Sequence, residues 1–119
     1  MVRYRPYVVL NAAMTLDGRI ATRKGDSAIS SQVDLERVHR LRAKVDAILV
    51  GINTVLTDDP LLTANYARKH PTRIIVDSKA RISFATNIIR SSNSIPTVIA
   101  VSDKAPKSKV EKIKSSGAT

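Results

Sequence analysis

Two short polar segments carry the residues best suited to hold a phosphate group. In the first, Gly51 directly follows the apolar run at residues 47–50, and Thr54 and Asp58 lie four residues apart just after it. A glycine at the end of a buried strand lets the backbone approach a ligand closely, and free amides at a following helical turn attract phosphate. Residues four apart on such a turn share a face, so Thr54 and Asp58 would offer a hydroxyl and a carboxylate to one ligand.

The second segment is the basic loop that follows the β-branched run at residues 73–77. It contains Ser78, Lys79 and Arg81. In open α/β sheets, ligands bind beyond the carboxyl ends of the strands, so this loop is expected at the same edge as Gly51. A hydroxyl and two cations placed there predict a clamp for a phosphate.

Each of these features also has a simpler structural explanation. Gly51 alone is explained by a tight turn at the end of a strand, and the loop at 78–81 by a solvent-exposed basic loop. Asp17 with Gly18 is a common turn dipeptide. Residues 57–60 are explained equally well as a helix stop. His39 and Arg42 are explained as a structural residue and a solvated surface residue of one helix. No single feature therefore identifies a reaction.

The elements that would position these residues follow from the apolar pattern. Residues 7–13 are apolar and β-branched without strict alternation, which predicts a central strand covered on both faces. Ser30 or Ser31 can cap a helix that runs to about Val45, with Asp34 in its first turn. That helix would cross over to a strand at 47–50 and complete a βαβ unit.

The rest of the chain predicts two more strands and two more helical segments. The strands are expected at 73–77 and 97–101, a helical turn at 52–56, and an amphipathic helix at 106–115 that ends near Gly117. Residues 61–71 are expected to form a loop and 91–94 a polar turn. The pattern is that of a predominantly parallel α/β sheet flanked by helices, which stops immediately after a helix and so looks interrupted.

The composition of the chain limits the classes of binding partner that it favours. The chain has 119 residues, 43% hydrophobic and 25% charged, which indicates one globular domain. Twenty Lys+Arg against ten Asp+Glu give a net charge of +10 and favour an anionic partner. Few aromatic residues accompany the basic ones, so a phosphorylated small molecule is a better partner than nucleic acid.

With no cysteine and only His39 and His70, a metal site is not expected. No apolar run is long enough to span a membrane, and we expect a cytoplasmic protein.

Five ordered segments together resemble a known enzyme family. They lie at residues 11–21, 29–31, 38–43, 46–63 and 73–78, and they include Asp17-Gly18-Arg19, Leu41-Arg42-Ala43, Val50-Gly51-Ile52-Asn53-Thr54-Val55-Leu56 and Thr57-Asp58-Asp59-Pro60. The series resembles the pyrimidine reductases of riboflavin biosynthesis, both the stand-alone archaeal and fungal type and the reductase half of the bifunctional bacterial deaminase-reductase. Agreement covers residues 6–82, and residues 83–119 fit only loosely.

The resemblance implies a dihydrofolate-reductase-like fold and an NADPH-dependent oxidoreductase. The expected substrate is 2,5-diamino-6-ribosylamino-4(3H)-pyrimidinone 5′-phosphate, whose ribosyl group is reduced to ribityl. The functional positions of the family's motifs can be matched to residues of this chain one by one. They imply cofactor contacts at Gly51, Thr54, Asp58, Ser78, Lys79 and Arg81, substrate contacts at Asn11, Met14 and Arg42, and proton supply or polarisation by Asp17. The resemblance also implies a homodimer.

Two departures from the family pattern leave alternatives open. Family members continue beyond the position that matches Thr119, through a Glu-Gly-Gly segment that packs against the cofactor phosphates. Residues 1–119 are therefore expected to be the N-terminal portion of one reductase domain. Asn65 also stands where the family often has a basic residue. The alternatives are a non-catalytic nucleotide- or anion-binding module and a related reductase of folate- or pterin-like substrates.

Overall fold

The computed structural model describes residues 4–25, 29–65 and 67–119, and the chain divides into two compact units. The first unit is Met1–Ser31 and the second is Gln32–Thr119. Every helix and strand of the described residues belongs to the second unit. They are α1 (Gln32–Arg42), β1 (Ala47–Gly51), α2 (Ile52–Asp58), β2 (Thr72–Val76), α3 (Asn87–Arg90), β3 (Thr97–Ala100) and α4 (Lys107–Ser115). None of these helices is long and apolar enough to cross a membrane.

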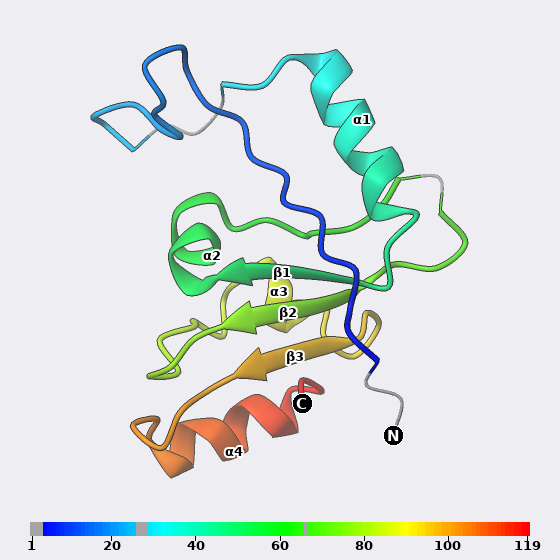
Figure 1. The fold of residues 1–119 in the computed structure, drawn as a ribbon. Helices are drawn as coiled ribbons and strands as arrows, with labels where there is room; N and C mark the ends of the chain where they lie inside the picture. The colour runs from blue at the N-terminus through cyan, green and yellow to red at the C-terminus, as the bar shows by residue number, and fades with distance from the viewer. Residues whose placement is uncertain (1–3, 26–28, 66) are drawn as a thin grey trace. The chain divides into compact units, whose positions relative to one another are not determined.

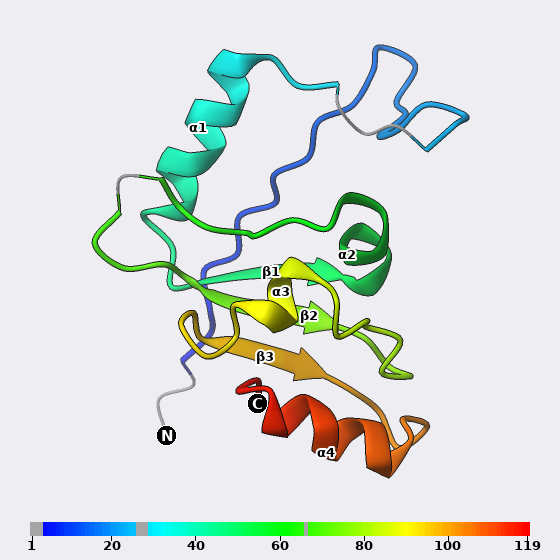
Figure 2. The same cartoon turned by 180° about the vertical axis from the view of Figure 1, so that it is seen from behind.

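The three strands form one parallel sheet in the order β1-β2-β3. Gly51 pairs with Val76, and Val76 pairs with Ala100, so all three strands end at the same edge. In Figure 1 the three arrows point the same way, with α3 behind the sheet, and Figure 2 shows α3 in front of it. Helix α4 runs beside β3 in both views. The α/β class and the parallel sheet flanked by helices are confirmed.

The expected strand at residues 7–13 is wrong. This segment has no regular secondary structure, and the described part of the first unit contains no strand that could pair with it. A strand is defined by backbone hydrogen bonds to a neighbour, and an apolar pattern reveals the side chains but not the neighbour. The expected βαβ unit that used this strand is therefore absent as well.

The other expected elements form within a few residues of their predicted limits. Helix α1 begins directly after Ser31 but ends at Arg42, before Val45, in a turn at residues 43–44. Asp34 lies in its first turn and pairs with Arg37. Helix α2 is longer than the expected turn, and α3 was not predicted at all. Turns and bends occur within residues 16–24 and include the Asp17-Gly18 dipeptide.

The core lies on the face of the sheet that carries Ile75 and Ile99. Because partners in register point to the same side, Val50, Ile75 and Ile99 form one row across the three strands. Ile75 is completely buried, and it belongs to the same apolar cluster as Val55 of α2 and Ile88 of α3. Helices α2 and α3 thus cover this face by contributing two buried branched side chains each.

Arg73 is a fully buried cation in the middle of this core. Its guanidinium donates to the carbonyl oxygens of Leu61, Ile88 and Ile95 and to the hydroxyls of Ser91 and Thr97, at 2.7–3.5 Å. Within the described residues no carboxylate lies at ion-pair distance from it. Burial lowers the pKa of Arg73, but an arginine remains protonated at physiological pH.

Replacement of Arg73 by methionine should destabilise the fold strongly. Arg73→Met removes every donor of the cluster and leaves several buried acceptors without partners, and each such group costs about 1–3 kcal/mol. Because the buried charge disappears too, we expect a net loss of about 2–4 kcal/mol in the free energy of unfolding, measured by urea denaturation. Arg90→Met on the exposed end of α3 is the matched control and should change stability by less than about 0.5 kcal/mol. Equal stabilities of the two variants would contradict this role.

Candidate functional site

A hollow lies at the carboxyl end of β2, next to the start of α2. It has a volume of about 310 Å³ and is lined by Ile52, Val76, Asp77, Ser78, Lys79 and Arg81. This is the sheet edge at which parallel α/β proteins bind ligands. The structure therefore brings together the basic loop after β2 and the segment that leaves β1, as the sequence predicted.

The carboxylate of Asp77 holds the backbone of this loop by hydrogen bonds. Asp77 is completely buried and accepts hydrogen bonds from the backbone N–H groups of Arg81 and Ile82, at 2.9 and 2.8 Å. Its own carbonyl accepts from the N–H of Ala80, which adopts a left-handed conformation with φ 52°. The chain is folded into a tight turn around one carboxylate, and Lys79 and Arg81 are directed outward by that turn.

Two further hydrogen bonds tie the loop to its neighbours. The Arg81 guanidinium donates to the side-chain oxygen of Asn53 on α2 at 2.6 Å. On the other side, the hydroxyl and the backbone N–H of Ser102 both donate to the carbonyl of Ser78, at 2.8 and 3.1 Å. The loop is thus fixed between the segments that follow β1 and β3.

Gly51, Thr54 and Asp58 lie on the β1–α2 connection. Gly51 precedes α2 with φ −79° and ψ 157°, and no side chain caps the helix there. A β-carbon built on Gly51 would meet no atom within 4 Å. Thr54 and Asp58 are exposed residues four apart on α2, as predicted, but neither lines the hollow.

Asp59, which follows Asp58, makes structural contacts with the start of α3. Its carboxylate accepts from the backbone N–H of Asn87 at 2.8 Å and from the Asn87 side chain at 3.0 Å. This cap lies at the start of α3, 28 residues along the chain. Asp59 itself adopts a left-handed conformation with φ 41° and forms the C-terminal cap of α2. The turn explanation therefore holds for Asp59.

Arg42 belongs to a separate group of contacts around the loop at residues 63–65. Its guanidinium donates to the carbonyl of Thr63 at 3.2 Å, while Nδ1 of His39 accepts from the N–H of Asn65 at 3.2 Å. Arg42 is half-buried, and this burial lowers its pKa. The alternative of a solvated surface residue is therefore wrong for Arg42, and His39 has the structural contact that was expected.

A second hollow adjoins this loop. It measures about 450 Å³ and is lined by Gln32, Leu35, Glu36, His39, Arg40 and Asn65. Arg42 is bonded to the loop that borders this hollow but does not line it. The described residues contain no group of three or more histidine, cysteine, aspartate or glutamate side chains arranged to hold a metal ion.

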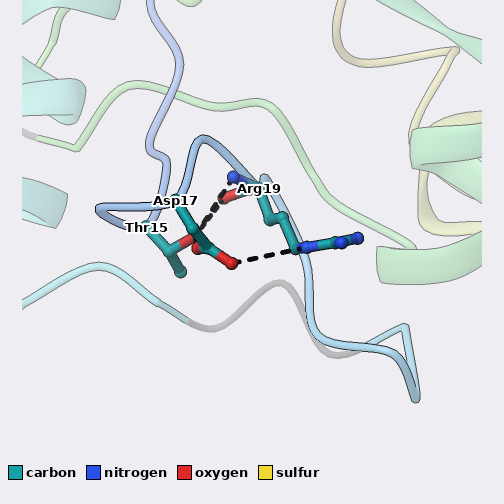
Figure 3. Close-up of polar contacts among 3 residues, drawn as sticks. All are labelled: Thr15, Asp17 and Arg19. Atoms are coloured by element: carbon teal, nitrogen blue, oxygen red, sulfur yellow. Dashed lines mark hydrogen bonds and ion pairs between the residues drawn. The ribbon is translucent and has the colours of Figure 1, made fainter.

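Asn11, Met14 and Asp17 lie in the first unit, and the structure gives only their local contacts. Figure 3 shows Asp17 between Thr15 and Arg19. The Thr15 hydroxyl donates to the Asp17 carboxylate, and Arg19 pairs with the same carboxylate at 3.4 Å. The backbone N–H of Gly18 donates to the Thr15 carbonyl, and Gly18 has φ 78°. The turn explanation for Asp17-Gly18 is confirmed, and Asn11 and Met14 are exposed in the preceding irregular segment.

Sequence reasoning missed three residues that organise the site. Asp77 and Arg73 were treated only as strand residues, and Asn53 was not singled out. A signal for Asp77 exists in retrospect, since an aspartate that ends a strand commonly caps the turn that follows. No local signal identifies Asn53, because its partner lies 28 residues away.

Comparisons with known proteins show the family of the chain. A family model described as RibD C-terminal domain matches residues 6–119. The 2,5-diamino-6-ribosylamino-4(3H)-pyrimidinone 5′-phosphate reductase of Methanothermobacter thermautotrophicus is 51% identical over 114 residues, covering 92% of this chain and 52% of the relative. The enzyme of the same name from Aquifex aeolicus is 42% identical over 120 residues, covering 96% and 53%. The chain thus spans about half the length of these relatives.

Solved structures of related proteins have a similar fold. The deaminase/reductase of Thermotoga maritima superposes with a TM-score of 0.68 at 33% identity, over 76% of this chain and 26% of that one. Acinetobacter baumannii RibD superposes with a TM-score of 0.69 at 22% identity, over 87% and 29%. The second likeness concerns the fold alone.

Removal of the Asp77 carboxylate should loosen the basic loop while the sheet remains folded. In Asp77→Ala the N–H groups of Arg81 and Ile82 lose their acceptor, which costs about 1–3 kcal/mol. Relative to the wild type, we expect amide hydrogen exchange at these two positions to accelerate. The acceleration should be at least about tenfold greater than the acceleration at Ile75 in the strand. The control is Asp103→Ala, which changes an exposed aspartate in the connection after β3 and should leave these rates unchanged. Unchanged exchange in Asp77→Ala would contradict this account.

Proposed function

The chain belongs to the RibD C-terminal domain family, and from this premise we propose that it is an NADPH-dependent pyrimidine reductase of riboflavin biosynthesis. The substrate would be a phosphorylated ribosylaminopyrimidine, whose ribosyl group becomes ribityl. Two relatives that share 42–51% identity with this chain carry the name of that reductase, and the chain spans about half of each.

The basic hollow beside β2 is the observation that carries this proposal. Lys79 and Arg81 supply two cations there, and Ser78 supplies a hydroxyl. The only carboxylate that lines the hollow, Asp77, already accepts two backbone hydrogen bonds from the loop. The donor set therefore suits a phosphate group of a dinucleotide, and the Arg81 fork can hold it through more than one hydrogen bond.

Gly51 supports the same assignment by elimination. Its φ of −79° is accessible to any residue, and the space where a β-carbon would stand is empty. Neither backbone strain nor packing among the described residues requires glycine at this strand exit. Close approach of a ligand to the backbone remains as the physical reason, and Thr54 and Asp58 on the adjoining helix would complete the cofactor contacts.

The remaining assignments concern the substrate and the hydride transfer to it. NADPH, when bound, supplies the hydride that reduces the anomeric carbon of the sugar, which is most simply pictured as an opened imine. We propose that Arg42 binds the substrate with the guanidinium donors that Thr63 does not occupy. Asn11 and Met14 would border the substrate, and Asp17 would polarise it or supply a proton.

Two statements about the whole protein belong to the same proposal. The cytoplasm is the expected location for a cysteine-free chain that takes a phosphorylated metabolite and NADPH. A homodimer is the expected assembly.

Turnover tests the reaction. The purified chain, given NADPH and 2,5-diamino-6-ribosylamino-4(3H)-pyrimidinone 5′-phosphate, should oxidise NADPH, followed by the loss of NADPH absorbance, and yield the ribityl product. Dihydrofolate serves as the competing substrate and should not be turned over. Oxidation with dihydrofolate alone would favour the related folate-type reductase. Saturable NADPH binding without turnover of either substrate would favour the non-catalytic nucleotide-binding module.

Substitutions on the β1–α2 connection should weaken NADPH binding without loss of stability. Gly51→Ala meets no atom and no backbone strain, so its free energy of unfolding should change by less than about 0.5 kcal/mol. Its NADPH affinity should nevertheless fall about tenfold, and that of Thr54→Ala and Asp58→Ala about three- to tenfold each. Isothermal titration measures these affinities, with Lys112→Ala on α4 as control. Unaltered affinity in all three variants would overturn the site assignment.

A further inference from the structure

Asn53 holds the side chain of Arg81, one of the residues that line the hollow. The Asn53 side-chain oxygen accepts from Arg81 Nη2 at 2.6 Å, and this contact joins α2 to the loop after β2. Arg81 lines the hollow, whereas Asn53 stands beside it on the second residue of α2. The hydrogen bond therefore sets the direction of the guanidinium at the edge of the hollow.

Other contacts fix the backbone of Arg81 but leave its side chain undetermined. The Asp77 carboxylate accepts the Arg81 backbone N–H at 2.9 Å, so the start of the side chain has a defined position. Several rotatable bonds separate that point from the guanidinium, and ordering them costs entropy. A partner at the far end of the side chain removes most of this freedom before any ligand arrives, which is preorganisation.

The partner is neutral, and this distinguishes Arg81 from Arg19 and Arg37. Arg19 and Arg37 pair with the carboxylates of Asp17 and Asp34. Arg81 has no carboxylate within ion-pair distance in the described parts of the chain. An amide oxygen orients a guanidinium without cancelling its charge, and it occupies only one of the five N–H donors. The others stay available to an anion.

We propose that Asn53 is a positioning residue that gives this site its preference for the phosphorylated cofactor NADPH over NADH. It directs Arg81 toward the additional phosphate of NADPH while leaving its charge uncompensated. The inference rests on the proposed function and adds to it a residue that acts through Arg81. An aspartate at the same position would keep an acceptor for Arg81 but would form an ion pair with it and repel the phosphate.

The test compares NADPH and NADH dissociation constants of the wild-type chain, Asn53→Ala and Asn53→Asp. Asn53→Ala loses the hydrogen bond, so NADPH affinity should fall about five- to tenfold. In Asn53→Asp the added negative charge should lower it about thirtyfold or more. NADH affinity should change by less than about twofold in both variants, because NADH lacks the phosphate that Arg81 would hold.

Two controls separate this role from a structural one. Asn53 is exposed, so both variants should keep the wild-type unfolding midpoint. Ser94→Asp adds the same charge at an exposed position that precedes β3, at the opposite end of the strands, and should leave the NADPH-to-NADH ratio unchanged. Arg81→Ala should abolish the preference, and combining it with Asn53→Ala should cause no further loss.

The outcomes distinguish the inference from the function it rests on. A wild-type chain that binds neither cofactor overturns the proposed function and the inference together. A wild-type chain that prefers NADPH, with the same ratio in both Asn53 variants, overturns the inference alone. Equal losses for NADPH and NADH would show a general structural role for Asn53 and would also overturn it.

Discussion

The buried guanidinium of Arg73 is the constraint on which the second unit depends. A cation without water or a carboxylate must find its hydrogen-bond partners in the protein, and Arg73 takes them from the connections on both sides of β2 and from β3. These bonds fix where α3 and the start of β3 lie against the sheet. Apolar side chains such as Ile75 and Ile88 fill the same core, but hydrophobic contact is not directional.

Asp77 continues this order from the core to the ligand-binding edge. It stands four residues after Arg73, directly after the end of β2, and is equally buried, so its carboxylate has a fixed position. The turn that it caps presents Lys79 and Arg81 outward, and Asn53 and Ser102 attach the turn to the neighbouring connections. The basic loop is thus a rigid extension of the sheet, which suits a site that must distinguish between similar anions.

Local patterns predicted the elements, and the failures concern contacts between distant segments. The strands at 47–51, 72–76 and 97–100 were predicted within one residue, because apolar runs bounded by polar residues identify them. The same kind of run at 7–13 forms no strand, because a pattern does not reveal a pairing partner. Helix α3 is too short for periodicity, and Asp59, its cap, lies far before it. Gly51 and the basic loop were predicted at one edge, but Asn53 was missed for the same reason as Asp59.

The order of the strands in the sheet has a consequence for how the chain assembles. Each strand pairs with its neighbour in the sequence, so the connections to be closed are residues 52–71 and 77–96, and the entropy of closing them grows only slowly with their length. The hydrogen bonds of the Arg73 guanidinium are nevertheless complete only when the whole segment from Leu61 to Thr97 has come together, because acceptors lie at both of its ends. The ligand-binding edge lies within that segment, since its loop directly follows β2.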